Sequence, residues 1–187
     1  MGILAALFER ERTGRGGRVE VNLLQAAIDL QGESITAWLN GAPRNSSRGL
    51  DGIATWFSPG GYGIHETIDG YIAISMSTPG DLGAALDVPQ IQAMSEGEEF
   101  SRREEITRHV ANRVKALTTA EAIAKLDAAK IWNAVVEDYD NLRNNPQLQH
   151  LKAFQTVESA TGVPVTLIGH PVRYNGVVPE PSDYINI

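Results

Sequence analysis

The chain has 187 residues, of which 42% are hydrophobic and 21% are charged, a composition typical of a globular protein with one or two domains. Its 16 lysines and arginines against 23 aspartates and glutamates give a net charge of -7, which argues against general binding to nucleic acid or to an anionic membrane. The absence of cysteine excludes disulfides, a thiolate nucleophile and cysteine-bound zinc, and it fits a cytoplasmic location.

The first expected element is an amphipathic helix that ends near Gly14. Its apolar residues recur at helical spacing and are Ile3, Leu4, Leu7 and Phe8. No serine, threonine, aspartate or asparagine precedes Ile3 to cap the first turn, so we expect a helix that is cut at Met1. A secretory signal is the competing interpretation, but the apolar run is short, lacks a cationic region before it and is followed by acidic residues.

The next segments predict an α/β connection followed by a linker. Val19, Val21 and Leu23 alternate with polar residues, which is typical of a half-buried strand. The run 24–39 has helical spacing weakened by Gly32, and its composition then changes to a linker rich in Gly, Ser, Asn and Pro.

The middle of the chain predicts a hairpin and three helical pieces. Two short strands flank Asp69-Gly70, a dipeptide that suits a tight turn because both residues tolerate positive φ. Pro79 with Asp81 indicates the start of the first helix. Capping boxes are expected at two later helix starts and are formed by Ser101 with Glu104 and by Thr118 with Glu121.

The C-terminal part predicts a short helix begun by Pro146, a second hairpin around 160–162 and a proline-rich tail. Together with the preceding segments, this order of elements predicts an α/β fold. No apolar run reaches the roughly 18 residues that a bilayer crossing needs.

Known catalytic motifs give little support for a specific chemistry. The four histidines share no metal-ligand spacing with a carboxylate, so we expect no zinc site. Val19 stands where a dinucleotide fingerprint would need its third glycine, and neither a GxxxxGK[ST] nor a GxSxG motif is present. The stretch "SPGGYG" is a candidate ligand loop, because Gly60, Gly61 and Gly63 around Tyr62 would let the backbone approach a ligand; a simple loop leading into the hairpin is the alternative.

Several motifs in order resemble the class III CoA-transferase family, which includes formyl-CoA transferases and α-methylacyl-CoA racemases. The opening stretch "GILAALFERERTGRGGRVEVNLLQAA" is similar to the family's apolar helix, charged T-G-R-G turn and V-x-V strand. "YGIHETIDGYIAIS", "NNPQLQHL" and "LIGHPVRYNG" resemble later family segments, so the resemblance spans essentially the whole chain.

The resemblance implies a C-terminal portion of an enzyme about twice this long, whose subunits interlock as a homodimer and whose large domain is Rossmann-like. By similarity, residues 1–40 belong to the edge of the large domain, 41–61 to a linker with the glycine-rich loop, 62–160 to a small α/β domain and 161–187 to a segment that returns toward the large domain.

The family's reaction implies coenzyme A as a substrate, with no bound cofactor and no metal. A catalytic aspartate attacks the acyl-CoA carbonyl, and by similarity it lies before Met1, so none of the 187 residues is assigned a catalytic role. Gly60, Gly61, Tyr62 and Gly63 are the substrate-loop candidates, and Leu23 falls where the family has a main-chain contact to the acyl group. "KIWNAVVED" departs from the family's Gly-[IV]-Pro-x-[AG]-Pro-V segment.

Three alternatives remain open at this stage. The parent enzyme is either a transferase or a racemase of the same family, because the residues that distinguish the two reactions are expected upstream. The chain is otherwise an inactive interaction module that pairs with a homologue or with a separate N-terminal half, or an α/β binding protein outside the family.

Overall fold

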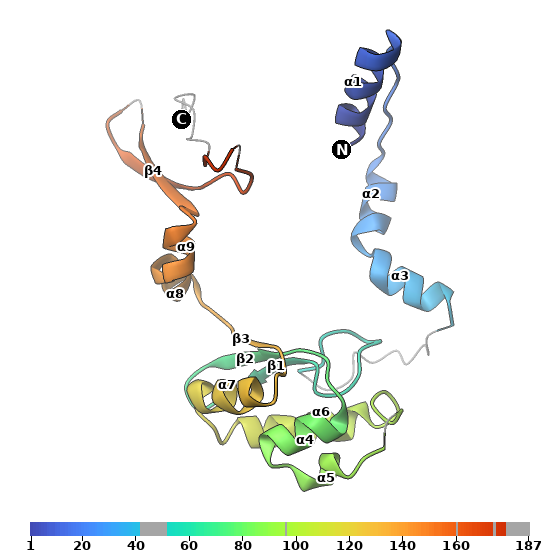
Figure 1. Ribbon diagram of the computed structural model, residues 1–187, viewed down its shortest axis with the longest axis vertical. Helices are drawn as coiled ribbons and strands as arrows, with labels where there is room; N and C mark the ends of the chain where they lie inside the picture. The colour runs from blue at the N-terminus through green and yellow to red at the C-terminus, as the bar shows by residue number, and fades with distance from the viewer. Residues whose placement is uncertain (42–51, 96, 160, 174, 179–187) are drawn as a thin grey trace.

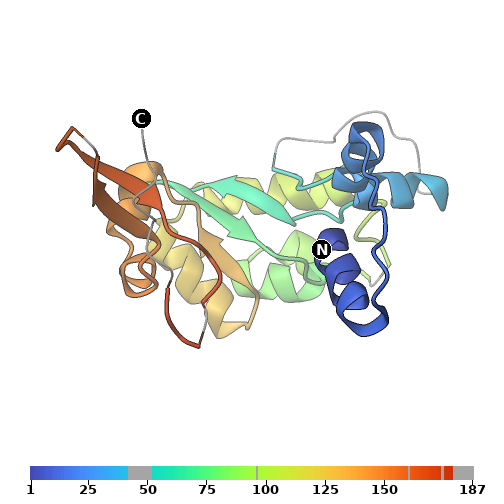
Figure 2. The same cartoon turned by 90° about the horizontal axis from the view of Figure 1, so that it is seen from above.

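A computed structural model describes residues 1–41, 52–95, 97–159, 161–173 and 175–178. These residues form a compact body and two extended arms that leave the body on the same side (Figure 1). The N-terminal arm carries the first three helices, and the C-terminal arm carries two short helices and a hairpin. Seen from above, the two arms stand at opposite ends of the sheet of the body (Figure 2).

The body is a three-stranded antiparallel sheet covered on one face by helices. Its strands β1 (Gly63–Glu66), β2 (Tyr71–Ile74) and β3 (Asn133–Val135) lie in the order β1-β2-β3. The helices lie beneath the sheet, on the face away from the arms (Figure 1). They are α4 (Pro79–Leu86), α5 (Pro89–Gln92), α6 (Arg103–Val114) and α7 (Thr119–Ala128).

The hydrophobic core of the described residues lies between sheet and helices. Ile72 and Ile74 point inward from β2 because alternate strand residues share a face, and Ile106, Val110 and Val114 do so from α6 at helical spacing. All five are fully or almost fully buried. The remaining core residues all fall between positions 82 and 131: Leu82, Leu86, Val88, Ile91, Met94, Leu117, Ala122, Leu126 and Ile131.

The predicted first hairpin is confirmed, but its turn differs from the expected one. Glu66 pairs with Tyr71, so four residues connect the strands, and the backbone N–H of Thr67 donates to the carbonyl of Gly70 at 2.9 Å. Neither Asp69 nor Gly70 has a positive φ. The dipeptide therefore does not act through backbone conformation, and the Asp69 side chain instead bonds to α7.

The helix starts of the body were predicted with mixed success. Thr78 caps α4, with Pro79 in the first turn, and Thr118 forms the predicted capping box with Glu121. The box at Ser101 is wrong, because the Ser101 hydroxyl donates to the carbonyl of Glu98 and α6 begins two residues later, without a side-chain cap.

The N-terminal arm contains the predicted opening helix, α1 (Gly2–Thr13), which ends at Gly14 in the left-handed conformation and has no side-chain cap at its start. The predicted strand Val19–Leu23 is wrong. A strand needs a hydrogen-bonded neighbour, and none of the described strands pairs with this segment. Instead, Asn22 caps α2 (Leu23–Leu30), and a break at Gln31 separates α2 from α3 (Gly32–Leu39). Most of the predicted linker lies outside the described residues.

The C-terminal arm contains the expected short helix α9 (Pro146–His150), preceded by α8 (Tyr139–Asn144). The second hairpin is also confirmed, since β4 (Phe154–Glu158) pairs with β5 (Pro164–Ile168) in antiparallel register. Its tip coincides with the expected domain boundary at 160/161.

Candidate functional site

The glycines of the candidate loop are buried in close contacts with the body. A Cβ atom on Gly60 would lie 2.5 Å from the carbonyl oxygen of Arg103, and one on Gly63 would lie 1.6 Å from that of Gly52. Gly61 has a φ of +81°, and a Cβ there would meet Leu82 at 2.5 Å. Glycine is therefore required at these three positions by packing within the chain itself.

Residues 52–63, which we name the 52–63 loop, are fastened at several points. The N–H of Ala54 donates to the carbonyl of Tyr62 at 2.9 Å and closes the loop on itself. The N–H of Gly60 donates to the Glu99 carbonyl at 3.0 Å, and the N–H of Gly61 donates to the Thr107 hydroxyl at 3.1 Å. The base of the loop is thus attached to α6 and to the segment before it.

Arg103, which is 5% exposed, holds the tip of the loop. Its guanidinium donates to the carbonyl of Trp56 and lies over the ring of Phe100, 4.8 Å from the ring centroid. Trp56 in turn packs edge to face with Phe57 at a centroid distance of 5.2 Å. These contacts give the loop an aromatic tip whose position depends on α6.

His65 fastens the loop to β1 from the opposite side. Its side chain is 2% exposed, and its Nε2 lies 3.0 Å from the carbonyl oxygen of Gly61. Because a carbonyl can only accept, Nε2 carries the hydrogen of this bond. Burial lowers the pKa of His65, while the bond to Gly61 acts in the opposite direction. The imidazole is therefore neutral near pH 7.

The structure brings the four loop candidates together but leaves Leu23 apart. Gly60, Gly61, Tyr62 and Gly63 are consecutive residues at the edge of the body. Leu23 is the first residue of α2, is 89% exposed and lies on the N-terminal arm, far from the loop (Figure 1).

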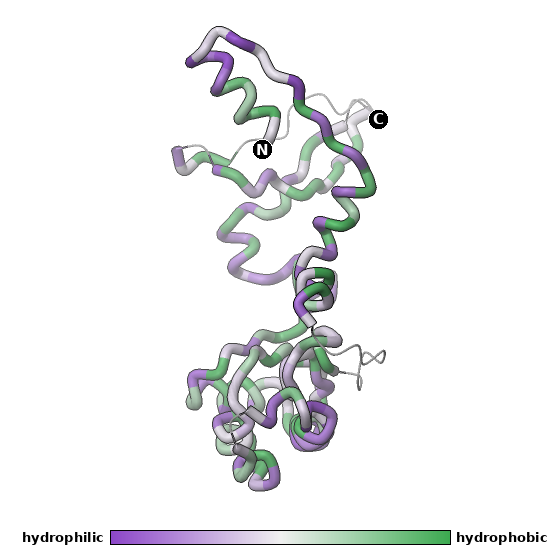
Figure 3. The backbone as a smooth tube through the Cα atoms, turned by 90° about the vertical axis from the view of Figure 1, so that its right-hand side faces the viewer, coloured by the Kyte–Doolittle hydropathy of each residue, from purple (hydrophilic) through white to green (hydrophobic). Residues whose placement is uncertain are grey.

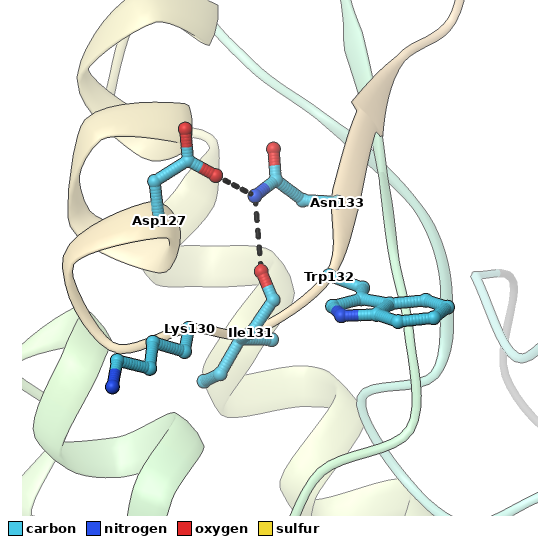
Figure 4. Close-up of a pocket in the computed structure, with 5 residues that line it drawn as sticks. All are labelled: Asp127, Lys130, Ile131, Trp132 and Asn133. Carbon is cyan, nitrogen blue, oxygen red and sulfur yellow. Dashed lines mark hydrogen bonds between the residues drawn. The ribbon is translucent and has the colours of Figure 1, made fainter.

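The segment that departs from the family pattern has become a strand with a hollow beside it. Asn133 begins β3, and its side-chain amide donates to the Asp127 carboxylate at 2.8 Å and to the Ile131 carbonyl at 3.0 Å (Figure 4). The hollow has a volume of about 400 Å³ and is lined by these three residues with Lys130 and Trp132. The Trp132 indole is 82% exposed and points away from Asp127, so the hollow does not enclose a ligand site.

Two apolar surfaces are open. On α1, Ile3, Leu4 and Phe8 are each about two-thirds exposed, and Figure 3 shows the hydrophobic start of this helix. On the sheet, Ile64 and Tyr71 lie on the face opposite the core and are each about half exposed. Neither surface is covered by another described element.

The described residues supply no cluster of three or more histidine, aspartate or glutamate side chains that could hold a metal ion. None of the helices in the described part of the chain has the length and apolar character needed to cross a bilayer.

Sequence reasoning identified the glycines but missed Arg103, Thr107 and His65, which hold them. The alternation in β1 carried a signal for His65, because it shares the inward face with Gly63. No local pattern predicts the Arg103–Trp56 contact, which joins residues 47 positions apart.

Comparisons with known proteins identify the family. The sequence model of CoA-transferase family III matches residues 1–183, so the chain belongs to this family. The succinyl-CoA:mesaconate CoA-transferases of Haloarcula hispanica and Haloarcula marismortui are 23% and 22% identical over 97% of the chain. The chain spans about half the length of these curated relatives, 46% of each.

Solved structures share the fold. Rv3272 from Mycobacterium tuberculosis superposes with a TM-score of 0.68 and 23% identity, covering 95% of this chain and 46% of that one. A CaiB/BaiF family protein from Brucella suis gives a TM-score of 0.60 and 17% identity, covering 98% of this chain and 50% of the other. The mixed α/β fold is thus that of class III CoA-transferases.

Proposed function

We propose that these residues form the C-terminal portion of a CoA-transferase that moves CoA between an acyl-CoA and a carboxylic acid. The observation that carries the proposal is the family match over residues 1–183 in a chain that corresponds to about half of its relatives. A transferase is favoured over a racemase because both curated relatives are named CoA-transferases.

In the proposed reaction, an aspartate outside these 187 residues attacks the acyl-CoA carbonyl, and CoA leaves as a thiolate. The thiolate then attacks the aspartyl carbonyl of the resulting anhydride, which releases the acid and leaves an aspartyl-CoA thioester. The acceptor carboxylate finally takes over the CoA. A carboxylate suits this sequence because anhydride and thioester are both activated acyl groups, so each exchange is nearly balanced in energy.

Within this scheme, the 52–63 loop covers the acyl group through Gly60, Gly61, Tyr62 and Gly63, and Leu23 contributes a main-chain contact. The resemblance supports the position of the loop. Its fastening to α6 adds that it acts as a fixed wall, since the glycine amides at its base are already bonded within the body.

We also propose the domain division 1–40, 41–61, 62–160 and 161–187, with the large domain completed by the rest of the family fold. The position of the core supports a small domain within 62–160, because the buried hydrophobic residues lie between Ile72 and Ile131. The open apolar face of α1 supports a covering partner, either the remainder of a large domain or, in an inactive module, a homologous chain.

The proposal is tested by incubating the folded 187-residue chain with acyl-CoA and searching for covalent adducts by intact-mass spectrometry. We expect none on this chain, and an aspartyl or glutamyl adduct on a family protein that includes the upstream half, measured in parallel. An adduct on the 187-residue chain would place the nucleophile within it and refute the assignment.

A further inference from the structure

The imidazole of His65 lies between the two ends of the 52–63 loop. Its Nε2 lies 3.0 Å from the Gly61 carbonyl near the end of the loop. At the beginning of the loop, a Cβ on Gly52 would lie 3.5 Å from Nδ1 and Cε1 of the same ring. One side chain on β1 therefore contacts both ends of the loop.

The surroundings of this imidazole contain no carboxylate that would stabilise a positive charge. β2 contributes Ile72 and Ile74 on the inward face. The 52–63 loop contributes Tyr62 as its titratable group. On the buried face of α6 the charged residue is Arg103, which repels a second cation.

The charges nearest in sequence lie elsewhere. Glu66 follows His65 on the opposite face of β1 and is paired with Lys115 at 2.7 Å. The other ionisable residues of α6 are not buried, and these are Glu104, Glu105, Arg108, His109 and Arg113. Among the described residues, no charged side chain stands among the causes that shift the pKa of His65.

We propose that His65 is an acid-sensitive latch: the neutral imidazole holds the 52–63 loop against β1, and a proton on the ring releases the loop while the helical core stays folded. The protonated ring still carries an Nε2–H, so the bond to Gly61 does not itself oppose protonation. The driving force is burial of an unpaired charge, which is relieved when the ring reaches water.

The topology confines the opening to the loop. β1 is an edge strand, so one side of it has no neighbour among the described strands. The loop is held to α6 through separate hydrogen bonds, whereas the core is a continuous apolar cluster without histidine. The open state is therefore reached by breaking a few bonds rather than by unpacking α6.

The direction of the pH dependence follows from the lowered pKa. The open state binds a proton more readily than the closed state, so acid favours opening. Between the closed-state pKa and the ordinary value of about 6.5, the opening constant rises about ten-fold per pH unit, and it levels off below that window.

Amide hydrogen exchange of the 187-residue chain, corrected for the intrinsic pH dependence of exchange, tests this proposal. Over roughly pH 7.5 to 5, which spans the ordinary range of histidine, we expect protection of residues 54–63 to fall with the one-proton slope. Protection of α6 should stay constant. Equal loss in the loop and in α6 would mean global unfolding and would overturn the proposal.

Two variants sharpen the test. In His65→Gln the amide can still donate to Gly61 but does not titrate, so the pH dependence of the loop should disappear. In His150→Gln, the same change at an exposed residue that ends α9, it should persist. If His65→Gln does not fold, an NMR titration of the wild-type imidazole replaces it, and loop resonances that do not follow that titration would overturn the proposal. No acyl-CoA is needed, so the outcome is independent of the proposed function.

Discussion

The carboxylate of Asp69 accepts hydrogen bonds from both the backbone N–H of Thr119, at 2.7 Å, and its hydroxyl, at 2.8 Å. Asp69 lies in the turn between β1 and β2, while Thr119 is the first residue of α7. The turn therefore places a negative charge at the positive end of a helix that begins 50 residues later.

Replacing Asp69 by alanine should lower the thermal unfolding temperature, because the first N–H of α7 and the Thr119 hydroxyl lose their acceptor. The pKa of Asp69 is lowered, first of all by the bond from the Thr119 N–H, so its contribution is present above the ordinary aspartate pKa and is lost as pH falls through the lower folded value. Calorimetric scans at neutral and acidic pH should show that the wild type and Asp69→Ala converge in acid. Asp69→Asn, which keeps an acceptor without the charge, should lie between them; a constant difference at all pH values would contradict the role of the charge.

Gly60→Ala should destabilise the body by about 1–3 kcal/mol, the usual cost of forcing an atom into a filled space. The added Cβ would meet the Arg103 carbonyl at 2.5 Å, and backbone cannot move aside as a side chain can. Gly16→Ala is the matched control, because a Cβ there has no neighbour within 4 Å and its effect should stay within about 0.5 kcal/mol. Urea unfolding measures both, and equal midpoints for the two variants would show that the loop yields easily.

Thr118→Ala should cost about 1 kcal/mol, since it removes the cap that accepts from the Glu121 N–H at 3.2 Å. Thr118→Ser keeps the hydroxyl and should stay near wild type. Helicity and unfolding midpoints by circular dichroism test the pair. A serine variant as unstable as the alanine variant would indicate that the threonine methyl group, rather than the cap, stabilises α7.

The open face of α1 should make the isolated chain self-associate and bind a hydrophobic dye. Leu4→Glu combined with Phe8→Glu should remove most of both effects, because these side chains are each 67% exposed on α1. Ile168→Glu changes a residue that is 85% exposed on β5 and serves as the control. Light scattering and dye fluorescence against concentration measure the outcome; a monodisperse monomer that binds no dye would refute a covering partner.

The sequence patterns that succeeded were those whose bonds are local. The Thr118–Glu121 box and the β1–β2 hairpin depend on neighbours a few residues away, so the residue types alone predicted them. The strand at Val19–Leu23 failed because alternation shows only that a segment suits a sheet, whereas a strand exists only with a neighbour.

The site shows the same difference. The glycines were recognisable as a group, but sequence could not tell contact with a ligand from contact with the chain itself. That distinction depends on Arg103 and Thr107, which lie more than 40 positions further along. The residues that hold the loop are therefore visible only after α6 has been packed against β1.

The core lies in one continuous stretch of sequence, from Ile72 to Ile131. During synthesis, every residue that the core needs is therefore available before the C-terminal arm has been translated. Domains generally fold as units in the order in which they emerge from the ribosome. The body can accordingly complete its packing on the nascent chain and present the finished sheet to whatever part of the protein, or of a second chain, later joins its arms.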